Sequence, residues 1–255
     1  MRQCIVLFGL SMACLSARAE PPSAPPAFDR PGLGFSTDTV GRGAVALEFG
    51  LPSYLRETDA EGVRSTTLSG DALLRTGLAP GLELQVSGTP WNRQRLRAPD
   101  GEGTRLRGAG DSSVGVKWAG PGSNDRTAWA VLATAVVARG DAAFSDGRQY
   151  ALAASVEQTL TDRWSLGLFA EQQRGAGQRT TTWAPSLSLQ ATPTVSTYLE
   201  AGFFDVNDAP DQTLAGAGLS WQVRPGVQLD VSFDVGLDDD SPDLQMASGL
   251  SIYLD

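Results

Sequence analysis

The sequence predicts an all-β protein, a transmembrane antiparallel up-and-down β-barrel of about 12 strands. Three observations predict this fold class. Segments of about ten residues alternate apolar with polar side chains, tight turns alternate with longer charged loops, and tryptophans gather near the tight turns. The composition agrees, because 29 glycines and only 19% charged residues in a chain of 255 are typical of strands and turns rather than of amphipathic helices.

A signal peptide is predicted over residues 1–19. Arg2 supplies a positive charge, residues 5–15 are largely apolar, and residues 17–19 (Ala-Arg-Ala) fit a small-x-small cleavage site. The apolar stretch is too short to cross a membrane as a helix. A lipoprotein anchored through Cys14 stays open as an alternative, although the residues before this cysteine lack the usual leucine.

Residues 20–43 form a Pro-rich segment with two interpretations. Its prolines favour an extended, unpaired chain, so a flexible periplasmic tail is the preferred interpretation. In the alternative, residues 28–39 fold back and plug the barrel.

Residues 44–255 are predicted to form the barrel. The alternation is clearest from Val227 to Leu237, where odd positions are apolar and even positions are polar or glycine. Because successive side chains of a strand point to opposite faces, this segment has one lipid face and one polar face. The twelve predicted strands cover residues 44–55, 64–77, 82–95, 109–119, 126–138, 148–160, 163–173, 180–191, 194–205, 212–222, 226–237 and 243–254.

The connections between these strands alternate in length. After even-numbered strands they are mostly tight, as at residues 79–81 (Ala-Pro-Gly) and 224–226 (Arg-Pro-Gly). After odd-numbered strands they are generally longer and more charged, as at residues 96–108 and 139–147. Short turns at one end and longer loops at the other are typical of outer-membrane barrels, with both termini on the periplasmic side.

Tryptophans support the same orientation. An aromatic belt is predicted near the periplasmic turns, because indole rings favour the headgroup region of a bilayer, where the apolar ring and the polar N–H are both satisfied. Outer-membrane lipid is therefore an expected partner. The belt consists of Trp118, Trp129, Trp164 and Trp221.

The polar phase of the strands is predicted to line the lumen. Nine of its charged residues are acidic and two are basic, so we expect a negative lumen with a modest preference for cations. Ion pairs made by the two basic residues could instead close it. Glu200, Asp230 and Asp234 are expected on neighbouring strands. The lumen-lining candidates are Glu48, Asp71, Arg75, Glu83, Asp111, Lys117, Glu157, Glu171, Glu200, Asp230 and Asp234.

Motifs for catalysis or cofactor binding are scarce, and the expectation is a protein that is not an enzyme. The chain has no histidine, which excludes Ser-His-Asp triads and His-ligated metals. Asp230 and Asp234 could act as acid and base, but alternating lumen charge predicts the same pattern. We expect no catalytic residues, no metal and no cofactor. The formal charge of −9 argues against a nucleic-acid partner.

Several segments, in their order along the chain, resemble the outer-membrane family labelled "putative MetA-pathway of phenol degradation". These segments are residues 29–40, 47–52, 108–119, 210–237 and 239–254. The resemblance implies an outer-membrane transporter that takes up small aromatic compounds, and it names no binding residues. The chain departs from the usual barrel pattern at its end, Tyr253-Leu254-Asp255, where outer-membrane barrels usually place a terminal aromatic.

Together these features predict an outer-membrane channel or transporter for small solutes, with aromatic or hydrophobic compounds as candidates. Two alternatives remain at this point: a structural or ligand-binding barrel with a closed lumen, and a soluble periplasmic β-sandwich that binds a ligand. In a sandwich, the polar phase of the strands would simply meet water.

Overall fold

The fold was analysed in a computed structural model, which describes residues 25–124 and 126–255. The predicted signal peptide lies outside the described residues. Thirteen strands form one antiparallel sheet. They are β1 (Val45–Thr58), β2 (Arg64–Ala79), β3 (Leu82–Arg97), β4 (Gly103–Gly108), β5 (Ser112–Asn124), β6 (Thr127–Ala138), β7 (Gln149–Thr159), β8 (Trp164–Gly175), β9 (Gln178–Thr192), β10 (Val195–Val206), β11 (Gln212–Arg224), β12 (Val227–Gly236) and β13 (Leu244–Leu254).

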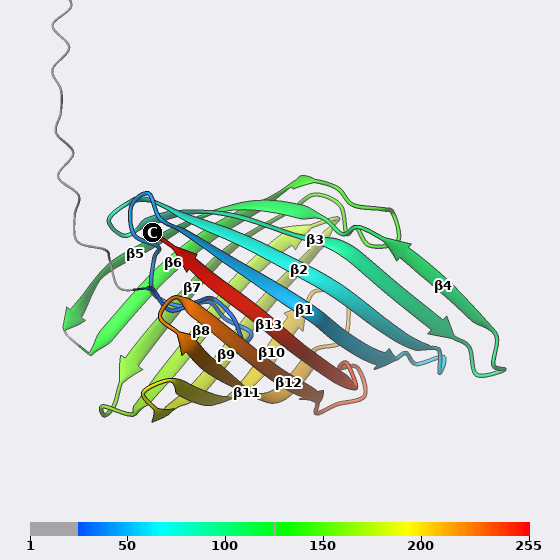
Figure 1. Ribbon diagram of the computed structural model, residues 1–255. Helices are drawn as coiled ribbons and strands as arrows, with labels where there is room; N and C mark the ends of the chain where they lie inside the picture. The colour runs from blue at the N-terminus through cyan, green and yellow to red at the C-terminus, as the bar shows by residue number, and fades with distance from the viewer. Residues whose placement is uncertain (1–24, 125) are drawn as a thin grey trace, which may run out of the picture.

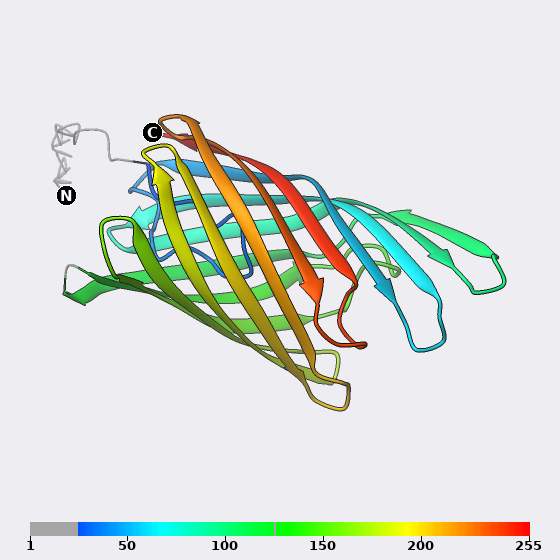
Figure 2. The ribbon, with the colours of Figure 1, turned by 90° about the horizontal axis from the view of Figure 1, so that it is seen from below.

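The sheet closes on itself. β1 pairs with β13 on one side and with β2 on the other, and β2 also pairs with β3, so the wall is continuous; among the described strands, only β4 pairs with a single neighbour, β3. Closure satisfies the backbone polar groups, as a strand structure in lipid requires. Figures 1 and 2 show the resulting barrel, in which β4 and β5 share one position in the wall. The predicted 12-stranded antiparallel barrel is therefore confirmed.

The prediction of a long connecting loop at residues 96–108 is wrong. These residues form most of a hairpin in which the outer half of β3 pairs with β4. The inner half of β3 pairs with β5, so one long strand partners two shorter ones. The break between them lies at residues 109–111, where the β6–β7 loop bonds to the chain through Asp141 N and Ala109 O, 2.8 Å apart. The hairpin projects beyond the rest of the barrel (Figure 1).

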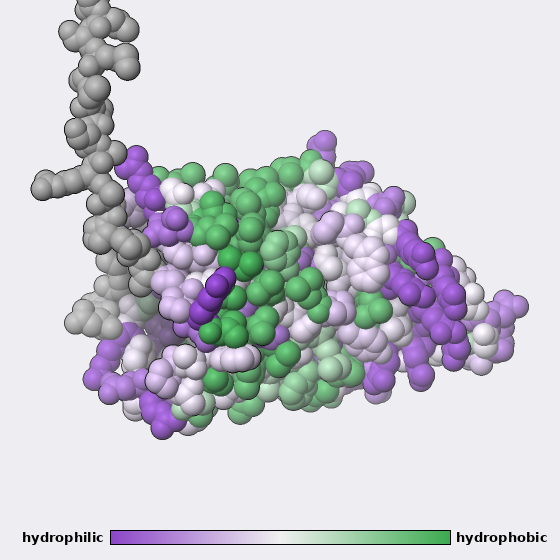
Figure 3. Space-filling view, viewed as in Figure 1, coloured by the Kyte–Doolittle hydropathy of each residue, from purple (hydrophilic) through white to green (hydrophobic). Residues whose placement is uncertain are grey.

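The outward face carries an apolar band (Figure 3). On β12, Leu229, Val231 and Phe233 are 42%, 54% and 48% exposed, whereas Asp230 and Asp234 on the opposite face of the strand are buried. Exposed apolar side chains around a closed sheet, with polar ones inside, invert the arrangement of a water-soluble barrel and fit a lipid environment. Among the described residues, no helix is long and apolar enough to cross a membrane.

The tryptophans of the predicted belt lie at the short-turn end of the barrel. Trp118, Trp164 and Trp221 are 54%, 41% and 45% exposed on the outward face. Trp118 also makes an edge-to-face contact with Trp129, with ring centroids 5.0 Å apart. Trp129 lies across from Gly120, where even a Cβ atom would collide with its ring. A glycine is needed there because the indole occupies the space of a side chain.

Candidate functional site

Residues 25–43, called the plug segment below, lie inside the barrel near the short-turn end (Figure 2). Lumen carboxylates accept hydrogen bonds from its backbone. Glu48 accepts from the N–H groups of Asp29 and Arg30, at 3.0 and 2.9 Å. Glu83 Oε2 accepts from Val40 N at 2.7 Å. These contacts agree with the plug interpretation of residues 28–39 rather than with the preferred one, a free periplasmic tail.

Arg75 on β2 is the centre of the polar contacts. Its side chain is fully buried, and all five of its N–H donors have partners. Nε and Nη2 bond to the two oxygens of Glu83 at 2.8 and 3.1 Å. Nη1 bonds to Glu48 Oε1 at 2.9 Å and to the carbonyl of Ala27 at 3.1 Å, and Nη2 also bonds to the carbonyl of Asp38 at 3.0 Å. Arg75 therefore joins two barrel carboxylates to both ends of the plug segment.

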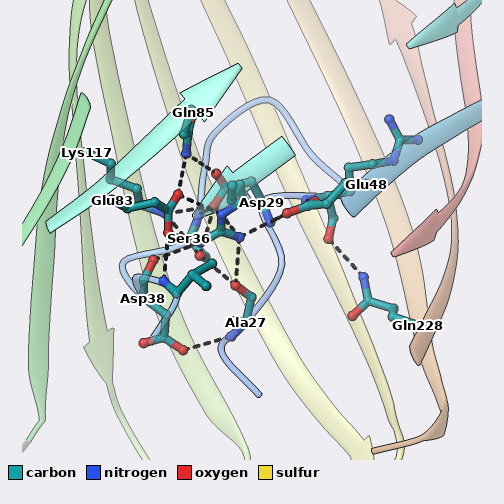
Figure 4. Close-up of polar contacts among 12 residues, drawn as sticks. Ala27, Asp29, Ser36, Asp38, Glu48, Glu83, Gln85, Lys117 and Gln228 are labelled. Atoms are coloured by element: carbon teal, nitrogen blue, oxygen red, sulfur yellow. Dashed lines mark hydrogen bonds and ion pairs between the residues drawn. The ribbon is translucent and has the colours of Figure 1, made fainter. Parts of the chain in front are cut away.

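Asp29 is the acidic group that the plug segment brings into this cluster. Its Oδ1 lies 2.8 Å from Lys117 Nζ and 3.2 Å from Arg75 Nη1, and its Oδ2 accepts from Gln85 Nε2 at 2.9 Å (Figure 4). Burial by itself raises the pKa of Asp29, but the charges of Arg75 and Lys117 outweigh it and hold the pKa below its ordinary value. The aspartate is therefore ionised at neutral pH.

Two apolar contacts complete the attachment. Phe28 and Val40 pack with Ala44 and Ala46, and Tyr253 of β13 lies against them. Tyr253 thus contributes to the interior of the barrel. On the opposite wall, Leu33 and Phe35 pack against the cluster of Ala153, Phe169 and Ala184, with the Phe35 and Phe169 rings 5.8 Å apart.

The opposite wall holds the plug segment by fewer polar contacts. Leu33 N donates to Glu200 Oε2 at 3.0 Å, and Arg30 Nη2 lies 3.4 Å from Asp230 Oδ1. Gly216 of β11 lies between Glu200 and Asp234 in register, and a Cβ there would collide with Asp234. This glycine makes room for the two carboxylates. β11 separates β10 from β12, so the expectation that Glu200, Asp230 and Asp234 lie on neighbouring strands is wrong.

A cavity of about 550 Å³ lies between the plug segment and the wall formed by β7 to β12. It reaches the residues of the short turns, including Asp162 and Pro193, so it borders the periplasmic mouth. Many of the wall residues that line it are small, and several of the larger ones are aromatic. The small ones include Ser155, Gly167, Ala184, Ser186, Ser188, Ser196 and Ser220; the aromatic ones include Phe169 and Tyr198, and Phe35 of the plug segment also lines the cavity.

The predicted lumen residues fall into three groups. Glu48, Arg75, Glu83 and Lys117 hold the plug segment, as described above. Glu200, Asp230 and Asp234 lie on the opposite wall, and Glu157 borders the cavity at its mouth, where it is exposed. Glu171 on β8 is half-buried.

The remaining two candidates bind other parts of the barrel. Asp71 accepts hydrogen bonds from the hydroxyls of Ser53 and Thr89, at 2.6 and 3.3 Å. Asp111 precedes β5 and accepts from Gly140 N at 2.8 Å. Burial raises the pKa of Asp111, but hydrogen bonds from Ser145 and from the backbone together outweigh it and lower the pKa below its ordinary value. Asp111 thus fastens the β6–β7 loop.

Sequence reasoning did not single out Asp29, Arg30 or Gln85. Asp29 and Arg30 lie in the Pro-rich segment, which lacks the alternation used to find inward residues. A signal was present, because a charged pair flanked by two phenylalanines, Phe28 and Phe35, is an unusual composition for a solvated tail. Gln85 is uncharged, so the charge pattern of the inward phase does not identify it.

Comparisons with known proteins agree with this architecture. The family described as "Putative MetA-pathway of phenol degradation" matches residues 28–254, which confirms the predicted family. No curated protein matches the chain.

Solved outer-membrane barrels are similar in fold. The COG4313 outer membrane channel from Pseudomonas putida F1 has a TM-score of 0.64 and 12% identity, covering 88% of this chain and 98% of that one. The β domain of the Bordetella autotransporter BrkA has a TM-score of 0.54 and 14% identity, covering 82% and 98%. The KdgM porin has a TM-score of 0.51 and 9% identity, covering 83% and 98%. The closed barrel and its apolar band, together with the match over residues 28–254, show that the chain is an outer-membrane β-barrel and belongs to the family described as "Putative MetA-pathway of phenol degradation".

Proposed function

We propose that this barrel is a passive outer-membrane channel for small solutes, narrowed by its own plug segment, and that it is not an enzyme. The observation that carries the proposal is the cavity of about 550 Å³ beside the plug segment, which borders the periplasmic mouth. Cavities of a few hundred Å³ suit small ligands. The small side chains of this wall leave space that long side chains would fill in a barrel of this width.

The plug segment is held unevenly, and this supports a route along the β8–β10 wall. On the β1–β5 side it contacts Arg75, Glu48, Glu83 and Lys117, all at most 1% exposed. On the β8–β10 side, residues 31–35 meet the wall through the Leu33–Glu200 hydrogen bond and through apolar packing. Moving residues 31–35 therefore breaks fewer polar contacts than moving the anchored ends of the plug segment does. Passage then requires a local shift of this tip, not release of the whole plug segment.

Small neutral aromatic compounds are the solute class we propose. The rings of Phe35, Phe169 and Tyr198 line the cavity, and aromatic pairs favour edge-to-face contacts of the kind that Phe35 and Phe169 already make. The family description concerns phenol degradation, which supports the same class.

A barrel with a closed lumen is the second candidate. The buried ion-pair cluster favours it, because a plug segment that is fastened by several charge-assisted hydrogen bonds is well suited to blocking the lumen permanently.

Uptake by proteoliposomes separates the two candidates. The refolded protein should admit phenol and small neutral sugars faster than empty liposomes do. Ser186→Trp, which places an indole in the cavity, should abolish most of this uptake. Leu187→Trp on the same strand faces lipid and should leave it unchanged. If the protein gives uptake no faster than empty liposomes, and removal of residues 25–40 then produces uptake, the lumen is closed. Equal uptake by the two tryptophan variants would contradict the route along this wall.

A further inference from the structure

The register of the projecting hairpin gathers six arginines on one face. β3 and β4 place Arg93 opposite Arg107 and Arg95 opposite Arg105. β2 and β3 place Arg64 opposite Arg97. Directly opposed residues of an antiparallel pair project from the same face. All six side chains are exposed, and we call them the arginine face.

This arrangement is unfavourable by itself, because like charges placed directly opposite each other destabilise a sheet. None of the six arginines forms an ion pair with any residue among 25–124 and 126–255. Arg56 on β1 shows the contrast, since it lies 3.4 Å from Asp243. The whole chain carries a formal charge of −9, so this basic face is opposite in sign to the net charge of the protein. Such a face calls for an anionic partner from outside the chain.

The position of the arginine face indicates which partner. Along the outward side of β3, Val86 and Trp91 are 42% and 46% exposed, and Arg93 follows directly. Leu82 pairs with Trp118 of the belt at the short-turn end. The nine residue-to-residue steps from Leu82 to Trp91 span about 23 Å of membrane thickness at a strand tilt of about 40°, close to the roughly 25 Å of an outer-membrane apolar band. The arginines therefore begin where the apolar band ends.

We propose that the arginine face binds the phosphate groups of lipopolysaccharide in the outer leaflet. The long-loop end faces the cell exterior, and the phosphorylated headgroups of that leaflet lie at this height. Guanidinium groups bind phosphate oxygens in bidentate fashion, and opposed arginines about 5 Å apart at Cα can bracket one phosphate. The face points in the same direction as Val86 and Trp91, toward lipid and not into the lumen. This inference does not depend on whether the lumen conducts.

Titration of the full refolded chain in detergent with fluorescent lipopolysaccharide tests the proposal. The variant Arg93→Gln/Arg95→Gln/Arg107→Gln should bind at least tenfold more weakly, since each arginine near an anionic headgroup contributes about fivefold. The control Arg42→Gln/Arg163→Gln/Arg224→Gln removes the same charge at the short-turn end and should bind within about twofold of the unmodified protein. Heat-modifiable gel mobility confirms that each variant is folded.

Two further probes identify the source of the phosphate. Lipopolysaccharide with its lipid A phosphates removed should bind as weakly as the triple variant does. Millimolar inorganic phosphate should displace the intact lipid only partly. The proposal is overturned if the unmodified protein binds the dephosphorylated and the intact lipid with equal affinity, or if the triple variant binds the intact lipid as tightly as the unmodified protein does. It is also overturned if the control variant loses as much affinity as the triple variant. Full displacement of the lipid by inorganic phosphate would overturn it as well, by indicating a site for free anions.

Discussion

Replacement of Arg75 by methionine should release the plug segment. The change removes one buried cation and leaves Asp29, Glu48 and Glu83 with Lys117 as the nearest remaining basic partner within the cluster. Removing one partner of a buried ion pair typically costs about 3–5 kcal/mol, because the remaining charge is left uncompensated. Part of that cost falls on the barrel wall, since Glu48 and Glu83 are on β1 and β3, and the rest falls on the bound plug segment.

The expected shift in plug binding is large. At about 1.4 kcal/mol for each factor of ten, 3–5 kcal/mol corresponds to roughly 100- to 4,000-fold, which is the upper limit of the shift in the plug-binding equilibrium because the barrel wall carries part of the cost. Two measurements report it. Single-channel conductance in planar bilayers should rise, and a cysteine at Val40, which is 1% exposed, should become reactive toward a maleimide. Both natural cysteines lie in the predicted signal peptide, so the new thiol is unique in the mature barrel.

Two controls accompany this variant. Adding Glu83→Gln to Arg75→Met removes one uncompensated carboxylate and should restore part of the protection of the Val40 thiol. Arg174→Met, at an exposed position, should change neither readout. If Arg75→Met leaves both the conductance and the thiol protection unchanged while the barrel stays folded, the cluster does not hold the plug segment and the reasoning is refuted.

Three other outcomes are expected. Val231→Arg on the lipid face should cost roughly 2–4 kcal/mol in the free energy of barrel unfolding, and Ser232→Arg on the inward face much less; equal losses in urea titrations would argue against a lipid-facing wall. Glu200→Gln with Asp234→Asn should lower the cation-to-anion permeability ratio of an open channel, measured from reversal potentials in a salt gradient, because these carboxylates lie beside the route. The pKa of Asp29 is lowered below 3.8, so the stability that its carboxylate gives the bound plug segment is complete above that value and is lost only as the pH falls through the lower folded pKa. The reactivity of a cysteine introduced at Val40 toward a disulfide reagent that stays active in acid should therefore stay low from pH 8 to pH 5. An increase in reactivity over that range would contradict the assignment.

The sequence by itself determined the barrel wall. The alternation from Val227 to Leu237 and the lengths of the turns are local properties, because side-chain direction in a strand changes at every residue and turn chemistry depends on a few neighbours. The same alternation identified Arg75 and Glu83 as inward residues. Where alternation weakens, at residues 96–108, the sequence predicted a loop and missed the β3–β4 hairpin, since that pairing depends on the partner strand as much as on the segment itself.

Only the tertiary structure decided what fills the lumen. Asp29 and Lys117 are 88 positions apart in sequence, and Leu33 and Glu200 are 167 apart, so neither contact leaves a local pattern. The Pro-rich segment resembles a solvated tail until the closed wall surrounds it with carboxylates, Arg75 and aromatic rings. Burial then makes each unpaired charge costly, and the backbone of the plug segment satisfies groups that the barrel alone leaves without partners.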